Sequence, residues 1–380
     1  MVKYIFWIAF LVSIVFQGVR LVANPIGDET IWTTAASTVQ SGNSHAFPAL
    51  DAYMHPGGPS IEGTILFHAL SKVSYTEALI AFLIMINSVM IGLICMLCYM
   101  LRKSLLWSLT VLAFISVQPI YMDSSLFFGL TPPSVMAAFS IALLVLLTLY
   151  LYEHTGTAKM HVLGYWAVLA GLAAASRIDA GGVMAVAMLL VLATKYDFKK
   201  MVIVAAGAFV AFCVFDPFMW FAPITQVAGL LSAVSNHYGG SGYSSVLLYF
   251  LPLLHVATLS LVSVFLGICF VLLRKEIPSP LPPRFLVYLL SVTALLSVIF
   301  LTADSQESRY FVPLILVWEV FLPFFVYSLI SKVQFSFVNT TDGQKKARYV
   351  LNAVVFLILI CPAALNFSTE VITQHILSRF

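Results

Sequence analysis

Residues 132–151 read PPSVMAAFSIALLVLLTLYL, an apolar run without a charged side chain. An α-helix needs about 20 such residues to cross the hydrocarbon core of a bilayer. Comparable runs occur on both sides of it, at roughly 4–22, 77–101, 105–121, 161–176, 180–194, 201–220, 244–273, 284–302, 310–331 and 349–365. The pattern predicts an all-α polytopic membrane protein with about 11 transmembrane helices, forming a single domain over residues 1–380.

The composition agrees with this prediction. Charged residues make up 9% of the chain and hydrophobic residues 61%, and the mean hydropathy is +1.00. A soluble domain carries roughly 25% charged residues, so a soluble enzyme, a nucleic-acid-binding protein and a disordered chain are excluded. The five cysteines fall in apolar runs, which favours buried small side chains over a zinc site or a disulfide framework.

The basic residues predict the orientation of the chain. If the N-terminus is cytoplasmic, 14 of the 19 Lys and Arg residues lie on the inner side, in agreement with the positive-inside rule. Eleven spans then place the C-terminus outside. The acidic residues show the opposite bias and gather on the outer side, so the chemistry is expected on the external face. The outer basic residues are Arg20, Lys72, Arg177, Arg309 and Arg379.

The longest outer loop, residues 23–76, begins with the adjacent acids Asp28 and Glu29. Two neighbouring carboxylates can act as a general base or hold a divalent cation. The residues also allow a structural interpretation, because a short helix is predicted over residues 30–39 and an acid is a favoured residue at a helix N-terminus. Both interpretations stay open from the residues alone.

Three other outer positions are candidates for substrate binding. His55 precedes a Pro-Gly-Gly-Pro turn in the first loop, and Asp123 lies at the outer end of the third span. His237 lies in a glycine-rich segment whose flexibility suits a lid over a substrate. Each has a structural alternative, because a lone histidine is more often structural than catalytic and an acid at a helix end is often a cap.

The turn at residues 176–179 joins two short runs, 161–176 and 180–194. These runs reach only about 24 Å across a hydrocarbon core of about 30 Å. Arg177 and Asp179 are therefore expected to lie below the outer surface, where an ionisable group needs a partner or a cavity. Either Arg177 forms an internal ion pair with Asp179 or Asp123, or it binds a phosphate-bearing ligand.

The last outer loop leads into a late span through Arg309 and Tyr310, which places a second cation at the mouth of that span. Glu319 lies ten residues further along the same span. A protonated carboxyl hydrogen-bonded between helices is favoured for Glu319 over a role in a site.

In this arrangement the sequence resembles the GT-C superfamily of membrane glycosyltransferases, and within it the protein O-mannosyltransferase and aminoarabinose-transferase branch. The resemblance extends over nearly the whole chain. The features that carry it, in order, are Gly27-Asp28-Glu29, His55-Pro56, Asp123, Gly171-Leu172-Ala173-Ala174-Ala175-Ser176-Arg177 and Arg309-Tyr310-Phe311-Val312-Pro313.

The resemblance implies that a sugar passes, with inversion, from a polyprenyl- or dolichyl-phosphate donor in the bilayer to a glycan, lipid or protein acceptor on the external face. Asp28 would remove the proton of the acceptor hydroxyl, and Glu29 would orient Asp28 or help to hold a divalent cation. The remaining roles would be donor phosphate binding by Arg177, Arg309 and Tyr310, and substrate binding by His55, Asp123, Asp179 and His237.

Two other functions compete with this one. A secondary transporter or lipid flippase would be expected to show inverted repeats and ionisable residues near the bilayer midplane. The sequence shows no such repeat, and its ionisable residues gather at the outer ends of the spans, with Glu319 as the exception. A glycosyltransferase-like scaffold without activity is the other alternative.

Overall fold

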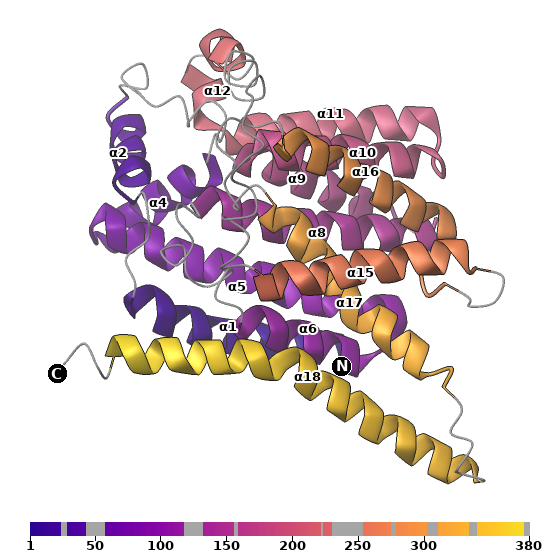
Figure 1. The fold of residues 1–380 in the computed structure, drawn as a ribbon. Helices are drawn as coiled ribbons and strands as arrows, with labels where there is room; N and C mark the ends of the chain where they lie inside the picture. The colour runs from indigo at the N-terminus through magenta and orange to yellow at the C-terminus, as the bar shows by residue number, and fades with distance from the viewer. Residues whose placement is uncertain are drawn as a thin grey trace.

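The fold comes from a computed structural model, which describes residues 1–23, 29–42, 58–117, 132–155, 159–221, 223–229, 254–274, 279–301, 311–333 and 340–375. Within these ranges the regular structure is helical. The long helices lie side by side with their axes in roughly one direction, which is horizontal in Figure 1. This arrangement is expected, because a segment that crosses a bilayer must bond its backbone polar groups internally.

The predicted spans correspond to helices in the described residues. Five of these helices, α5, α8, α11, α16 and α17, are long and apolar enough to cross a membrane, and five shorter apolar segments lie in α1, α6, α9, α10 with the turn before it, and α15. The protein is therefore a multi-pass integral membrane protein, while the full number of about 11 spans stays a prediction. The bounds are α1 (Val2–Ala23), α5 (Tyr75–Arg102), α6 (Leu105–Val117), α8 (Pro132–Glu153), α9 (Met160–Ser176), α10 (Val183–Ala193), α11 (Phe198–Phe215), α15 (Leu254–Leu272), α16 (Pro283–Leu301), α17 (Val312–Ile330) and α18 (Thr341–His375).

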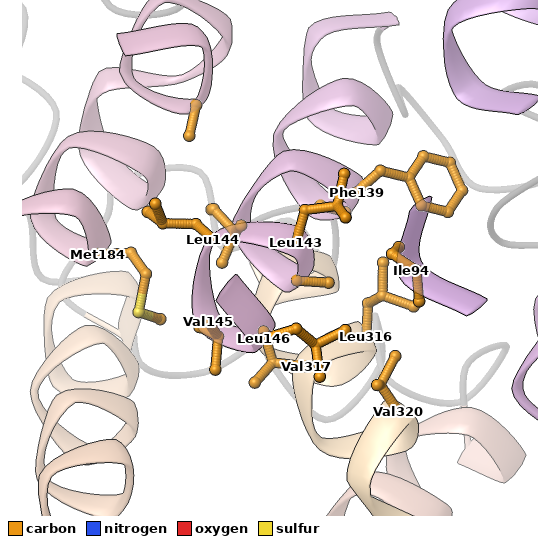
Figure 2. Packing of buried hydrophobic residues seen from close by; sticks show 14 of the residues in the cluster. Ile94, Phe139, Leu143, Leu144, Val145, Leu146, Met184, Leu316, Val317 and Val320 are labelled. Carbon is orange, nitrogen blue, oxygen red and sulfur yellow. The ribbon is translucent and has the colours of Figure 1, made fainter. Parts of the chain in front are cut away.

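Helices α8 and α17 form the centre of the bundle. In their apolar segments 89% and 83% of the residues are buried inside the protein, compared with 22% in α11 and 28% in α16. Figure 2 shows side chains of α8, among them Leu143 and Leu146, packed between Met184 of α10 and Leu316 and Val317 of α17. The helices around this centre expose large apolar side chains, which is expected of a surface that faces lipid.

Buried tryptophans fasten the outer helices to this centre. An indole N–H is a donor that needs an acceptor when it is buried, and three of these tryptophans find one on a neighbouring helix. The bonds run from Trp107 Nε1 to the Val320 carbonyl (2.7 Å), from Trp166 Nε1 to Thr148 Oγ1 (2.8 Å), and from Trp318 Nε1 to Thr293 Oγ1 (2.9 Å).

Helices α9 and α11 pack closely through small residues. A Cβ on Gly171 of α9 would overlap Ala211 of α11, and a Cβ on Gly207 of α11 would lie 3.4 Å from the Ala167 side chain. Small residues at a helix interface let the two backbones approach, which is a common basis for helix association in membranes. This contact holds the C-terminal ends of α9 and α11 beside each other, at the end of the bundle where the candidate site lies.

The two ends of the bundle differ in their side chains and in their connecting segments. One end, called here the Arg102 end, contains the bidentate ion pair of Arg102 with Glu153 (2.6 and 2.5 Å) and a bond from Arg102 Nη2 to the Pro280 carbonyl (2.9 Å). At this end the Lys195 ammonium also lies 4.6 Å from the centroid of the Tyr152 ring. The segments 102–104, 153–155, 194–197 and 279–282, all predicted to be cytoplasmic, therefore lie together.

The opposite end, called here the α4 end, carries the helices of the first loop. These are α2 (Glu29–Gln40) and α4 (Gly58–Ser71), and the short helix α12 (Pro217–Phe221) lies at the same end. Helix α18 also finishes at this end of the bundle (Figure 1). The prediction of a long first loop with short helices is thereby confirmed, and α2 coincides with the helix predicted over residues 30–39.

Two predicted spans have different bounds in the structure. The run at 201–220 breaks at Asp216, because Pro217 lacks an amide hydrogen and disfavours helical backbone at the residue before it; Asp216 has φ −117° and ψ 97°. Helix α18 extends beyond 349–365 in both directions, since hydropathy marks only the apolar part of a helix and not its polar flanks. For the run at 244–273, the part before Leu254 lies outside the described residues.

Candidate functional site

The N-terminus of α4 is wedged against two other parts of the chain at the α4 end. A Cβ on Gly58 would overlap the Phe215 carbonyl and lie 2.9 Å from the Cα atom of Asp216, so only glycine allows this approach. Two residues further on, Ser60 Oγ donates a hydrogen bond to Met136 Sδ of α8 (3.2 Å). The first loop, α8 and the junction of α11 with α12 therefore meet here.

Asp216, at this junction, is a fully buried carboxylate. Its Oδ1 accepts a hydrogen bond from the Phe218 N–H (3.1 Å) and its Oδ2 accepts one from Gln226 Nε2 (3.0 Å). Gln226 belongs to the helical residues 223–229 and is only 1% exposed. Burial raises the pKa of Asp216 to about 6, although the hydrogen bonds act in the opposite direction.

Glu62 is a second carboxyl group close to Asp216. It lies one turn after Gly58, on the same face of α4, because residues four apart on a helix are neighbours. Its Oε1 is shielded from solvent and has no hydrogen-bond partner. Burial, and then repulsion from Asp216, raise the pKa of Glu62 to about 8. Glu62 is therefore mostly protonated at neutral pH in this arrangement.

Arg177 and Asp179 form a buried ion pair at the end of α9. Arg177 leaves the helix in an extended conformation (φ −160°, ψ 106°), and the π-helical turn η2 (Ile178–Gly182) brings Asp179 back beside it. Arg177 Nε donates to Asp179 Oδ1 (2.8 Å) and Nη2 donates to Oδ2 (2.5 Å), with the two side chains 0% and 1% exposed. Two parallel bonds fix the plane of the guanidinium group.

A glycine makes this turn possible. The Gly181 N–H donates to the Arg177 carbonyl (2.7 Å), and the Arg177 N–H donates to the Ala173 carbonyl (3.0 Å). A Cβ on Gly181 would overlap that same carbonyl of Ala173. The turn can therefore fold back onto α9 only with glycine at this position, and this fold positions Arg177.

The structure brings together two of the residues singled out from the sequence, Arg177 and Asp179. It forms the internal ion pair that was one of the two interpretations of Arg177, and phosphate binding stays a prediction. Glu29 is the first residue of α2, and Glu319 is buried within α17. Six candidates lie outside the described residues and stay predictions: Asp28, His55, Asp123, His237, Arg309 and Tyr310.

The sequence analysis did not single out the group formed by Glu62, Asp216 and Gln226. The signal for Asp216 was present, because an Asp-Pro pair interrupts an apolar run and predicts a helix end. No comparable signal links Glu62 to Asp216, which lie far apart in the sequence and meet through the packing of Gly58. No group of three or more His, Cys, Asp or Glu side chains fit for a metal occurs among the described residues.

The fold and the position of these groups define a class of protein: a multi-pass helical membrane protein with loop helices and buried ionisable side chains at one end. Neither a model of a known protein family nor a curated protein sequence matches the chain.

Among solved structures, the chain is similar to the oligosaccharyltransferase of Archaeoglobus fulgidus. With its apo form the TM-score is 0.56 at 14% identity, over 98% of this chain and 56% of that one. With its complex with Zn and sulfate the TM-score is 0.51 at 14% identity, over 97% and 53%. The chain thus spans about half the length of the solved structures that it matches, and at this identity the likeness concerns the fold.

Proposed function

We propose that this protein transfers a sugar, with inversion, from a polyprenyl- or dolichyl-phosphate donor to a glycan, lipid or protein acceptor on the external face of the membrane. The observation that carries the proposal is the match of nearly the whole chain to the fold of an oligosaccharyltransferase. The concentration of buried ionisable groups at the α4 end adds support, because such groups are costly in a membrane protein and usually functional.

The proposal places the α4 end on the external side. The Arg102 end carries exposed lysines of the segments predicted to be cytoplasmic, among them Lys195, Lys199 and Lys200. The positive-inside rule favours this end for the cytoplasm. Sugar transfer at the α4 end would then use an acceptor outside the cell or in the lumen, and a donor that diffuses in the bilayer.

The general base in this proposal is Asp28, with Glu29 orienting it or helping to hold a divalent cation. Glu29 is the first residue of α2, and Asp28 precedes it in the sequence. Negative side chains are favoured near a helix N-terminus by the helix dipole. An ionised carboxylate can accept the proton of the acceptor hydroxyl as the new glycosidic bond forms.

The donor phosphate would be bound by Arg177, Arg309 and Tyr310. A guanidinium group neutralises charge on a departing phosphate, and its effect is largest where it is held in place before the reaction. The bidentate pair with Asp179 is the competing interpretation of Arg177. The proposal therefore requires the donor phosphate to reach a buried guanidinium whose orientation that pair fixes. The proposed contacts with the sugar and the acceptor come from His55, Asp123, Asp179 and His237.

The test is sugar transfer by the purified protein in liposomes, supplied with radiolabelled lipid-phosphate sugars. We expect the wild type to consume one of them. We expect Asp28→Asn to lower the rate by roughly 10²–10⁴-fold, the usual contribution of a general base. Asparagine caps a helix as well as aspartate does, so the helix should persist. Asp197→Asn, which removes an exposed acid at the Arg102 end, is the control and should leave the rate unchanged.

Transfer by Asp28→Asn at the wild-type rate would assign Asp28 to helix capping instead of catalysis. If the wild type consumes no lipid-phosphate sugar while it stays folded, the proposed reaction is wrong.

A further inference from the structure

We propose that Glu62, Asp216 and Gln226 form a binding site for a hard divalent cation of the Ca²⁺, Mg²⁺ or Mn²⁺ class. The site would join α4 of the first loop to the end of α11. It uses residues other than the acidic pair Asp28–Glu29, and it rests on different observations.

The first observation is the packing that brings the three side chains together. The contact of Gly58 with Asp216 places the start of α4 on the last residue before α12. Glu62 follows one helical turn later on the same face, roughly 5–6 Å further on. Gln226 reaches Asp216 from the other side through its Nε2 atom (3.0 Å). Side chains from three separate segments of the chain thus come together around Asp216.

The second observation is independent of the acids. The side chain of Gln226 is 1% exposed, and its Oε1 is buried without a hydrogen-bond partner. Its Nε2 donates to Asp216, so the amide is anchored at the carboxylate with its oxygen as an acceptor. A buried polar atom without a partner costs roughly 1–3 kcal/mol. An unpartnered amide oxygen on a side chain that is bound to Asp216 is a ligand type that a cation would satisfy.

The third observation concerns charge. Within the described residues no basic side chain forms an ion pair with Glu62 or Asp216. Two neighbouring carboxylates repel each other when both are ionised, and Glu62 Oε1 has no hydrogen-bond partner. A divalent cation would supply the missing positive charge. Carboxylate and amide oxygens without nitrogen or sulfur ligands favour Ca²⁺, Mg²⁺ or Mn²⁺ over Zn²⁺.

The consequence of binding would be mechanical. The cation would tie the first loop, which carries the proposed catalytic acids, to the junction of α11 and α12. A ligand that binds only the folded protein stabilises it in proportion to its concentration. The inference therefore predicts a cation-dependent stability that can be measured without any assay of sugar transfer.

The experiment uses the full chain in detergent, stripped with a chelator before the cation is added. We expect about 1–10 mM Ca²⁺ or Mn²⁺ to raise the thermal midpoint by roughly 2–5 °C. This rise should be absent in Glu62→Gln and Asp216→Asn. In chelator alone, Glu62→Gln should be at least as stable as the wild type, because it removes a buried repulsion.

The matched control is Glu77→Gln. Glu77 is an exposed acid at the same end of the bundle, where it caps α5 through Ser74. Its replacement removes the same charge and should leave the full response to the cation. Electron paramagnetic resonance of bound Mn²⁺ supplies a second readout. If Asp216→Asn does not fold, this readout still compares the wild type with Glu62→Gln.

Three results would overturn the inference. One is a wild-type midpoint that does not respond to any of the three cations. Another is a response of equal size in Glu62→Gln and Glu77→Gln, which would indicate unspecific binding to the acidic face. The third is Mn²⁺ binding that survives Glu62→Gln and disappears in Asp28→Asn, which would place the cation at the acidic pair instead.

Discussion

Each end of the bundle contains an arginine bound to a carboxylate by two hydrogen bonds, but the surroundings of the two pairs differ. At the Arg102 end, Arg102 and Glu153 keep 22% and 18% of their side-chain surface exposed. At the α4 end, Arg177 and Asp179 are almost completely buried. The same bidentate ion pair is thus partly exposed to solvent at the Arg102 end and shielded from solvent at the α4 end.

The difference indicates what each end does. Arg102 also bonds the Pro280 carbonyl, so its pair links three segments at the membrane edge where water and lipid head groups can solvate it. A dry pair is harder to explain by stability, because apolar residues of similar size often stabilise a protein as well as a buried ion pair does. The buried pair of the α4 end therefore agrees with the function proposed for that end, and the pair of the Arg102 end agrees with anchoring.

The largest stability effect is expected when each arginine is removed in turn. Arg177→Ala leaves Asp179 buried without its guanidinium partner, which should cost about 3–5 kcal/mol of unfolding free energy. Arg102→Ala removes an ion pair that is partly exposed to solvent, and it should cost only about 1–2 kcal/mol of unfolding free energy. Chemical or thermal unfolding of the two variants in the same detergent measures the difference.

The double variants sharpen this comparison. Removing Asp179 together with Arg177 should recover part of the lost stability, because no uncompensated charge remains. Equal losses of unfolding free energy in Arg177→Ala and Arg102→Ala would contradict the expectation that burial makes the two ion pairs unequal.

Glycines provide a second comparison between the ends. Gly181→Ala places a Cβ against the Ala173 carbonyl and should destabilise the protein by about 1–3 kcal/mol. Gly164, near the Arg102 end of α9, has nothing within 4 Å of the corresponding position. Gly164→Ala should therefore be neutral or stabilise the helix by up to about 1 kcal/mol. Thermal midpoints of the two variants decide this, and a Gly181→Ala protein as stable as Gly164→Ala would show that the turn can relax.

The smallest effect concerns pH in the absence of divalent cations. An acid whose pKa is raised by folding holds its proton more tightly in the folded state. The contribution of Glu62 to stability is therefore complete below its ordinary pKa of 4.5 and is lost as the pH rises through about 8. We expect the thermal midpoint in chelator to fall modestly over this range, and Glu62→Gln to flatten that slope. A slope equal to that of the wild type in Glu62→Gln would show that Glu62 does not titrate in this window.

Much of the bundle could be predicted from the sequence, because apolar runs such as 132–151 report directly which segments can enter a bilayer. Hydropathy alone carries the run at 201–220 past the break at Asp216, because apolar residues continue on both sides of Pro217. The Asp216-Pro217 pair is the sequence signal for the end of the helix. The sequence predicted only residues 349–365 of α18, because hydropathy does not detect the polar residues at either end of a helix.

The candidate site was only partly accessible to sequence reasoning. The Arg177–Asp179 pair was one of the interpretations of Arg177. It forms although residues two apart on a regular helix do not face each other, because the chain is extended at Arg177 and then turns through η2. The approach of Glu62 to Asp216 depends on a close backbone contact at Gly58. Such contacts between distant segments leave no periodicity that a pattern could detect.

The account is tested most directly by conservative replacement of the two arginines, with the transfer rate measured against donor concentration. A lysine keeps the charge but cannot form two parallel bonds to a phosphate. We predict that Arg177→Lys raises the KM for the lipid-phosphate donor by roughly tenfold or more, the size expected for a lost charge-assisted hydrogen bond, while Arg102→Lys leaves it unchanged. Equal kinetics in the two folded variants would contradict the assignment of donor binding to the α4 end.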